Sequence, residues 1–442
     1  MKGTNRIAFT LMTLALVGMQ LAALPVMPAK ALSLAAYYGP PPAGTFTYNR
    51  NTTYFYNYTY TISKSGFGPF LTERWIPMIT NRTILGESGV RQQEFVMTSL
   101  TYGSSLSHVF DVDDFGNEFH YFDLSVPSGT TWKMNVQGNL TLRDVTWKSQ
   151  AGVTMASYNK TDGLYSLYTK EERYINKSFG PIVTAASSLN ASNPWTTAAN
   201  VYNYVKNLLT YSVQSEEHGA EWAITYHTGD CTEYSYLMVA LLRACGIPAR
   251  VLRGLVIANS AGSAVSPNYG AAVGTKWRFA FETTGLSTTQ DNMTGHAWAE
   301  YFIPGAGWVL SDPTWGDGGS IDFTSRIDNI HVPYTVGVWI GQGLTPPLSP
   351  TPSENVSTLP YPFWVSSGVN QAVHYDFMVL QQEAPPSIWD QLLDFFTKNP
   401  WVLYCLIGLI AIVIVIHAIR KRRKSSGYSD SSYYRERVTF SY

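Results

Sequence analysis

Polar and apolar residues alternate with a period of two between residues 46 and 147. Runs such as residues 53–62, which are crowded with Tyr, Phe and Thr, are separated by turn clusters that contain Gly, Ser, Asn or Pro. This pattern is typical of strands that bury one face. We therefore expect an all-β unit in this part of the chain, built as a sandwich.

One turn in this unit, residues 111–116, is rich in aspartate. It resembles the start of an EF-hand calcium loop. However, Phe115 and Phe122 stand where such a loop needs an oxygen donor and a bidentate Glu. We interpret the segment as a hairpin turn.

The pattern becomes helical near residue 180. Asn193 and the following proline precede apolar residues at positions 198, 201, 205 and 208, which predicts a helix. A second helix is predicted after Asp230, a typical N-cap with Glu233 three residues further on. Gly246 followed by Pro248 is a typical helix end.

Strands are predicted on both sides of a stretch rich in Gly, Ser, Ala and Asn. Residues 250–256 and 296–310 have strand patterns, whereas residues 258–275 suit a surface loop. Helices and strands together predict an α+β core.

Two segments indicate export to a membrane surface. Lys2 and Arg6 precede an apolar stretch, and Ala-Lys-Ala ends at residue 31, which is the layout of a secretory signal. An uncleaved anchor is the alternative. Residues 401–419 are almost wholly apolar, and basic residues 420–424 follow at once. This predicts a single-pass plasma-membrane protein with its bulk extracellular and its tail cytoplasmic, a buried core helix being the alternative.

Charged residues make up only 14% of the chain and the formal net charge is -1, which argues against nucleic acid as a partner. Asn-X-Ser/Thr sequons are dense on the predicted outer side, which indicates a glycoprotein. A glycosylated, weakly charged exterior on one anchor suggests an archaeal cell surface, with a bacterial envelope as the alternative. The sequons are at Asn51, Asn57, Asn81, Asn139, Asn159, Asn176, Asn190, Asn292 and Asn355.

The cysteines indicate a free thiol. Cys405 lies in the predicted membrane segment, and Cys231 and Cys245 lie at the two ends of one predicted helix. At 1.5 Å per residue those two are about 21 Å apart, whereas a disulfide allows about 7 Å. A free Cys231 in an exported protein calls for an explanation, and catalysis is one.

Cys231 is expected to be the first residue of its helix, where unsatisfied N–H groups and the helix dipole favour a thiolate. Buried cysteines are common, so this position alone does not establish a nucleophile. A thiolate enzyme also needs a histidine held by a third group. His296 and Asp312 lie on the two strands of a predicted hairpin, and their even spacing allows both to share one face. Alone, His296 would be an ordinary histidine beside a strand.

These segments resemble the motifs of the transglutaminase-like superfamily. The cysteine motif lies at residues 229–251, the histidine motif at 295–300 and the aspartate motif at 308–314. Residues 201–212 resemble the leading helix of the family. The resemblance spans residues 195–316, about a quarter of the chain.

The resemblance implies a papain-like core in which Cys231 is the nucleophile, His296 the general base and acid, and Asp312 the group that orients the imidazole. It implies a thiol enzyme that forms an acyl-thioester from a protein or peptide amide. Water as acceptor gives a peptidase or amidase, and an amine gives a transferase. Prokaryotic relatives are more often hydrolases, so hydrolysis comes first. The alternative is a catalytically inactive scaffold or binding protein of the cell envelope.

The chain as a whole is then an α+β transglutaminase-like core preceded by an all-β sandwich-like domain and followed by one transmembrane helix. Its expected partners are a protein or peptide substrate at the cell surface and the membrane. The predicted segments are a signal peptide (1–31), a β-rich N-terminal domain (32–180), the transglutaminase-like domain (181–335), an extension and linker (336–400), the transmembrane helix (401–419) and a basic cytoplasmic tail (420–442).

Several residues near the motifs have open roles. The backbone N–H of Cys231 is a natural oxyanion donor, but the second donor is unassigned. Glu300 either contacts substrate or pairs with a cation. No cofactor is inferred, and four histidines without metal-ligand spacing imply no zinc site. Those histidines are His108, His120, His218 and His331. The upstream candidates for the second oxyanion donor are Trp222, Tyr226 and His227. Three further aromatic residues either line a substrate cleft or belong to the core, namely Trp298, Trp308 and Trp315.

Overall fold

The computed structural model describes residues 45–83, 91–261, 264–267, 271–292, 295–316, 321–337, 366–383, 402 and 412–421. The predicted signal peptide, and most of the predicted transmembrane segment 401–419, lie outside these residues. Among the residues described, no helix is both long and apolar enough to span a membrane. The chain divides into two units, Met1–Glu383 and Ala384–Tyr442. In the second unit, residues 412–421 are helical.

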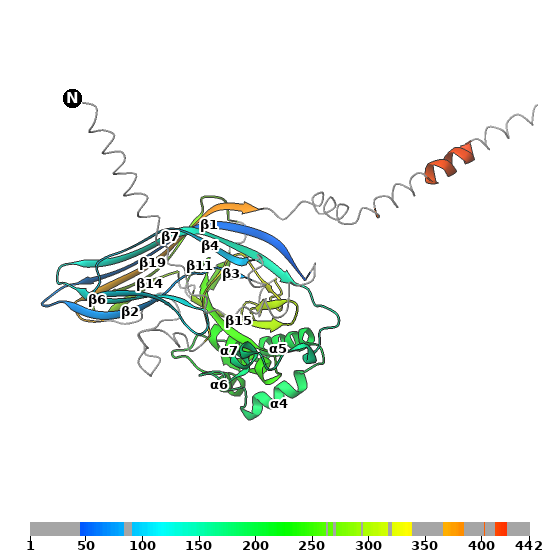
Figure 1. The fold of residues 1–442 in the computed structure, drawn as a ribbon, viewed down its shortest axis with the longest axis horizontal. Helices are drawn as coiled ribbons and strands as arrows, with labels where there is room; N and C mark the ends of the chain where they lie inside the picture. The colour runs from blue at the N-terminus through cyan, green and yellow to red at the C-terminus, as the bar shows by residue number, and fades with distance from the viewer. Residues whose placement is uncertain are drawn as a thin grey trace, which may run out of the picture. The chain divides into compact units, whose positions relative to one another are not determined.

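A long antiparallel sheet forms the β-rich part of the first unit (Figure 1). Its strands follow the order β14-β13-β19-β1-β7-β4-β3, and β17 pairs with β7. The strands are β1 (Phe46–Lys64), β3 (Arg82–Thr83), β4 (Arg91–Tyr102), β7 (Thr131–Trp147), β13 (Lys276–Thr284), β14 (Ser287–Asp291), β17 (Arg326–Ile327) and β19 (Val369–Glu383).

A smaller sheet, in the order β2-β6-β5, contributes side chains to the same hydrophobic core. Tyr60 and Ile62 of β1 belong to one buried cluster with Phe122 and Leu124 of the smaller sheet. In β1, buried positions alternate with half-buried ones, as period-two patterning predicts. The small-sheet strands are β2 (Phe70–Pro77), β5 (Ser107–Val112) and β6 (Glu118–Val126).

The aspartate-rich segment is the turn between β5 and β6, as predicted. Asp113 accepts hydrogen bonds from the backbone N–H groups of Phe115 and Asn117, at 3.0 and 2.8 Å. Its carboxylate is therefore engaged in holding the turn.

The large sheet extends beyond the predicted boundary at residue 180. β13 pairs with β19, and β19 pairs with β1 along most of its length. The segment predicted as an extension and linker, 336–400, thus contributes a central strand. The predicted loop at residues 258–275 is also partly wrong, because β11 (Ala258–Ala261) and β12 (Ala264–Pro267) form a hairpin there.

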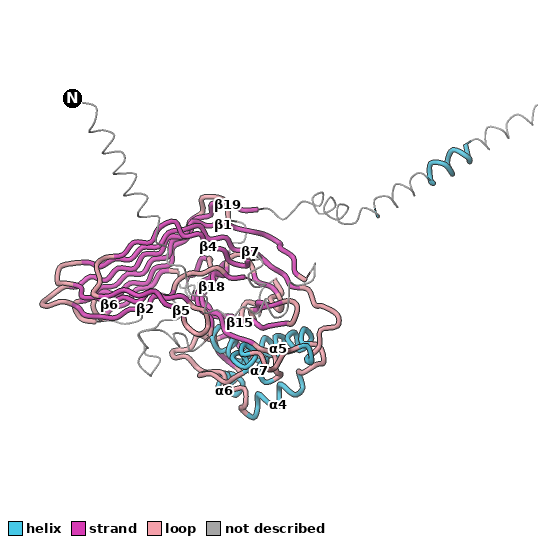
Figure 2. Tube along the Cα trace, viewed as in Figure 1, coloured by secondary structure: helices cyan, strands magenta, loops and turns pink. Residues whose placement is uncertain are grey.

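The α+β core has a four-stranded antiparallel sheet in the order β16-β15-β10-β18. Helices α4 to α7 gather beside β15 (Figures 1 and 2). The core strands are β10 (Ala249–Val256), β15 (Gly295–Ile303), β16 (Gly307–Ser311) and β18 (His331–Val336); the short strands β8 (Thr210–Tyr211) and β9 (Thr228–Gly229) pair in parallel; the helices are η2 (Met155–Ser157), α3 (Gly163–Thr169), α4 (Gly180–Leu189), α5 (Pro194–Leu208), α6 (Ala220–Tyr226) and α7 (Cys231–Ala244).

Helix α7 begins and ends where the sequence predicts. The Asp230 carboxylate accepts from the N–H of Thr232 at 3.0 Å, and Glu233 accepts from the N–H of Asp230 at 2.9 Å. The Asp230 side chain also accepts from the backbone N–H of Glu233, so Asp230 and Glu233 form a capping box that satisfies otherwise free donors. At the other end, Gly246 adopts a left-handed conformation with φ +82°. The helix is buried along its whole middle, from 233 to 243, rather than on one face. It is therefore the central element of the core.

Candidate active site

Helix α7 places Cys231 at its first position, and the side chain is half-buried. Cys231 and Cys245 are both free thiols, as their predicted separation requires. The Cys231 carbonyl accepts the hydroxyl of Ser235, one turn further on, at 2.7 Å. Because Cys231 is the first residue of α7, it lies at the positive end of the helix, where the N–H groups of the first turn are free of intrahelical partners.

Strand β15 carries His296, which is only 8% exposed. In the sheet register His296 lies opposite Gly254 of β10. A Cβ at Gly254 would lie 2.0 Å from the carbonyl oxygen of Val332 and 2.8 Å from the Trp298 ring. Glycine is therefore required at this position, and it lets β18 and Trp298 pack closely around His296.

Asp312 lies directly after β16 and is fully buried. Its Oδ2 accepts a hydrogen bond from His296 Nε2 at 2.7 Å. Its Oδ1 accepts the backbone N–H groups of Thr314 and Trp315 at 2.9 and 3.1 Å. The hairpin therefore brings His296 and Asp312 together as predicted, and these three donors hold the carboxylate in place.

The thiol of Cys231 also lies close enough to His296 to affect the pKa of its imidazole. Burial alone would lower the pKa of the imidazole, but the charge of Asp312, followed by Cys231, outweighs burial and raises it to about 9. His296 in turn holds the pKa of the buried Asp312 carboxyl far below its usual range, against the opposing effect of burial. The hydrogen bond between His296 and Asp312 and the influence of Cys231 on the His296 pKa therefore place the three side chains in one site.

Residues 183–313, which include all three side chains, match the family profile described as the transglutaminase-like superfamily. The chain contains a transglutaminase-like domain. An uncharacterized Bacillus subtilis protein, YebA, is 31% identical over 127 residues, which cover 29% of this chain and 15% of YebA. The match thus spans only a small part of that curated relative.

The solved structures that match this chain are more distant in sequence. A Cytophaga hutchinsonii protein provisionally assigned as a cysteine protease has 15% identity and a TM-score of 0.41, over 74% of this chain and 99% of that chain. The periplasmic domain of TgpA from Pseudomonas aeruginosa, bound to ethylmercury, has 17% identity and a TM-score of 0.30, over 59% and 90%. Red sea bream transglutaminase has 10% identity and a TM-score of 0.25, over 57% and 47%.

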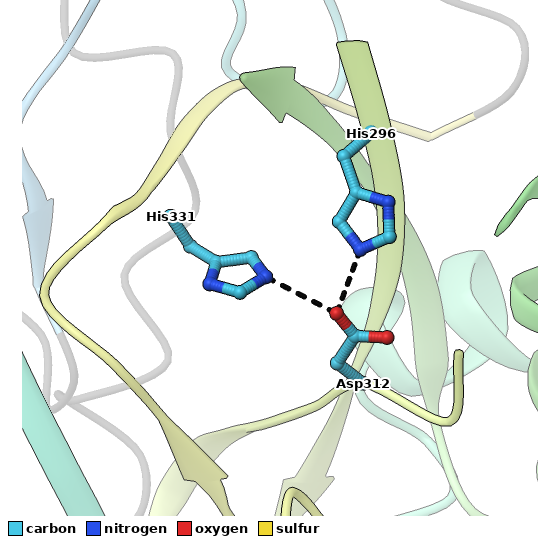
Figure 3. A group of neighbouring side chains, drawn as sticks. All are labelled: His296, Asp312 and His331. Carbon is cyan, nitrogen blue, oxygen red and sulfur yellow. Dashed lines mark hydrogen bonds and ion pairs between the residues drawn. The ribbon is translucent and has the colours of Figure 1, made fainter. Parts of the chain in front are cut away.

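The sequence did not reveal a fourth partner of the Asp312 carboxylate in this transglutaminase-like domain. His331, the first residue of β18, directs its Nε2 to the same Asp312 Oδ2 at 3.1 Å (Figure 3). Its Nδ1 lies 2.6 Å from Asp328 Oδ1. No motif marks Asp328 or His331, because both reach the site through the pairing of β18 with β10. The only sequence signal that links Asp328 and His331 is that they lie three residues apart at the start of a strand.

His296, Asp312 and His331 are the candidates for holding a metal ion among the described residues. Zinc ligands about 2 Å from a tetrahedral ion lie roughly 3.3 Å from one another. Here both imidazoles direct a nitrogen at one carboxylate oxygen, at 2.7 and 3.1 Å. A metal would have to replace both hydrogen bonds. The arrangement is therefore that of a hydrogen-bond network.

Tyr211 of β8 borders the site. Burial, followed by the negative charges of Cys231, Asp230, Glu233 and Asp312, raises the pKa of its hydroxyl. Tyr211 is 47% exposed, so it lies at the surface of the protein near these groups. Sequence reasoning assigned no role to Tyr211.

The remaining predicted residues serve the scaffold. Glu300 pairs with Arg250 at 3.0 Å and lies 3.9 Å from Arg82, so it is a partner for cations. Trp298 and Trp308 belong to the core, as favoured from the sequence, whereas Trp315 is half-buried with its ring 5.9 Å from that of His296.

The upstream candidates for a second oxyanion donor have other contacts. Trp222 stacks on His218, with ring centroids 4.2 Å apart. His227 forms the left-handed C-cap of α6, and Tyr226 is exposed. The second donor stays unassigned.

We expect the folded state to lose stability as the pH rises through about 9. The pKa values of His296 and His331 are both raised to about 9, whereas the pKa of a histidine in the unfolded chain is about 6.5. The folded state therefore binds these protons more tightly. The resulting stabilisation is complete below about pH 6.5 and is lost as the pH rises through about 9.

Urea unfolding of the full-length protein between about pH 7 and 10, followed by circular dichroism, measures this effect. Each group contributes a slope of up to about 1.4 kcal/mol per pH unit. His331→Gln should flatten the decline. His374→Gln, at a partly exposed histidine that pairs with Glu282, should not. A stability that is constant or rises in wild type over this range would contradict the expectation.

Proposed function

We propose that this chain is a cell-surface thiol enzyme in which Cys231 attacks an amide carbonyl of a protein or peptide. One observation carries the proposal. A free, half-buried thiol at a helix N-terminus lies close enough to His296 to affect the pKa of its imidazole, and His296 Nε2 donates to the buried carboxylate of Asp312. A nucleophile, a base and an orienting group in that order form the arrangement that nucleophilic catalysis requires.

In the proposed acylation each group has one task. Asp312 holds His296 through Nε2, which leaves Nδ1 as the ring nitrogen for the Cys231 side. The proton of the thiol passes to His296, and the sulfur attacks the carbonyl carbon. The backbone N–H of Cys231 is placed to stabilise the oxyanion. His296 then protonates the leaving nitrogen, the C–N bond breaks, and a thioester remains on Cys231.

Deacylation reverses the proton transfers. His296 removes a proton from water or from an amine, and the acceptor attacks the thioester carbon. The C–S bond then breaks and returns the thiolate. Water yields a carboxylic acid, and an amine yields a new amide. Following the resemblance to prokaryotic relatives, we place hydrolysis first, as a peptidase or amidase acting on surface protein or cell-envelope peptide.

An acceptor competition tests this proposal. The full-length protein is incubated with glutamine-containing peptides and a fluorescent primary amine, and the products are analysed by mass spectrometry. We expect hydrolysed amides or new N-termini that depend on Cys231. Incorporation of the amine at glutamine would assign the transferase branch instead. Products that are the same with wild type and Cys231→Ser would sink both branches and favour the inactive scaffold.

The location is part of the same proposal. Residues 401–419 serve as one transmembrane helix, the basic tail 420–442 lies in the cytoplasm, and the transglutaminase-like domain faces the exterior. The apolar run before five successive basic residues supports this orientation. Asn139 and Asn190 are exposed sequon sites that would accept glycans. Protease treatment of intact cells should remove the domain; its full protection would overturn the orientation.

The inactive scaffold is the second candidate. It would use the sandwich-like sheets for binding, with Cys231 as an ordinary thiol. The buried Asp312–His296 pair argues against the scaffold, because burying a carboxylate and an imidazole costs free energy and a protein without catalytic activity gains nothing from that cost.

A further inference from the structure

His331 contacts Asp312 at Oδ2, the same carboxylate oxygen that His296 contacts. Its two ring nitrogens each face a carboxylate oxygen, Asp328 Oδ1 at 2.6 Å and Asp312 Oδ2 at 3.1 Å. Ionised carboxylates only accept hydrogen bonds, so both nitrogens must carry protons. The contacts therefore define a positively charged imidazolium between two negative groups.

Asp328 is itself held in place. It is fully buried, and its Oδ1 accepts the backbone N–H groups of Ile330 and His331 at 3.1 and 3.2 Å. These bonds fix the carboxylate at the start of β18. Asp328 therefore orients the His331 ring towards Asp312.

Within the described part of the chain, three charged or titratable groups lie at His331. They are Asp328 before β18, Asp312 after β16, and His296 on β15, whose ring centroid is 5.5 Å away. The other faces are aromatic: the rings of Trp298 and Trp315 both lie 5.1 Å from His331. Aromatic walls exclude water, so charges here interact strongly.

We propose that His331, held by Asp328, is a positioning residue of the transglutaminase-like site. It fixes Asp312 Oδ2 in line with His296, and its positive charge limits how strongly Asp312 retains a proton on His296. Its meaning for catalysis rests on the proposed function. The proposal itself concerns the electrostatics of His296 and can be tested without turnover.

Charge balance gives the physical reason. With both imidazoles protonated, two positive rings balance the carboxylates of Asp328 and Asp312. Removing the charge of His331 leaves the buried set with an excess negative charge next to His296. The His296 imidazolium would then hold its proton more tightly and be a poorer acid towards a leaving amine.

The electrostatics of His331 agree with this geometry. Burial would lower its pKa, but the charge of Asp328, followed by the hydrogen bonds to Asp312 and Asp328, outweighs burial and raises it to about 9. At neutral pH the ring is thus charged even though it is fully buried.

Histidine NMR tests the proposal directly. The full-length protein, labelled with ¹³C-histidine and carrying Cys231→Ser, is titrated, and the His296 signal is assigned by loss in His296→Ala. Cys231→Ser removes the thiolate, so the reading does not depend on catalysis. The variants are His331→Gln, which can keep a donor to Asp312 but loses the charge, Asp328→Asn, and the double variant.

We expect His331→Gln to raise the His296 midpoint by about one pH unit, a tenfold tighter proton. Asp328→Asn removes a negative charge and should not raise the His296 midpoint. In the double variant the His296 midpoint should return towards that of the parent. A purely structural role would leave the midpoint in place. A His331→Gln midpoint at or below the parent would overturn the proposal. If His331→Gln fails to fold, Asp328→Asn decides alone: a lowered His296 midpoint supports the proposal, and an unchanged or raised midpoint overturns it.

Discussion

Cys231→Ser is expected to lower acyl transfer by at least about 10⁴-fold, because losing the nucleophile of a triad removes nearly all of the chemistry that its members perform together. A serine hydroxyl at the same position stays protonated beside His296, since it is far less acidic than a thiol. The measurement is product formation from the peptide substrates at saturating concentration. The thermal midpoint should stay close to that of wild type, because the substitution is nearly isosteric.

Cys245→Ser is the matched control. Cys245 lies at the other end of α7, is buried, and donates to the carbonyl of Ala186 at 3.5 Å. Burial raises the pKa of its thiol to about 11, which makes it unreactive at neutral pH. Activity should therefore survive Cys245→Ser. Equal losses in both variants would show that the effect of Cys231→Ser comes from the fold.

Asp312→Asn should lower acyl transfer by about 10⁴-fold and also destabilise the fold. The single oxygen of an amide cannot accept every donor that now faces Asp312, and the neutral side chain no longer stabilises the His296 imidazolium. The carboxylate has a lowered pKa, so its stabilisation is present at neutral pH and is lost only as the pH falls well below about 4.

Replacing Asp312 therefore removes this stabilisation at pH 7. The expected cost is about 3 kcal/mol or more, because two buried imidazoles lose their shared partner. Denaturant unfolding at pH 7 measures the loss. Asp322→Asn, at an exposed carboxylate that caps Thr324 nearby, serves as control and should change stability by less than about 1 kcal/mol. Wild-type activity in Asp312→Asn would remove Asp312 from the mechanism.

The sequence predicted the elements whose signals are local. The capping box of Asp230 and Glu233 and the terminal Gly246 delimit α7, and the short turn between β15 and β16 sets the register of the hairpin. These features place Cys231, His296 and Asp312 on the correct elements. A short turn fixes pairing over a few residues, so no long-range information is needed.

The parts that the sequence did not predict depend on long-range pairing. β19 shows period-two burial, yet nothing local indicates that it pairs with β1 more than 300 residues earlier in the chain. His331 reaches Asp312 only because β18 lies along β10. Register between distant strands is set by the packing of the whole core, which a local pattern does not encode.

The most direct test of the central claim is the alkylation rate of Cys231 across pH. The full-length wild type and His296→Ala react with iodoacetamide, and peptide mapping identifies the labelled residue. An activated thiolate–imidazolium pair predicts fast labelling of Cys231 that continues below about pH 7, where ordinary thiols are mostly protonated, and that slows in His296→Ala. Labelling at the rate of an ordinary thiol, unchanged by His296→Ala, would contradict the account and favour the inactive scaffold.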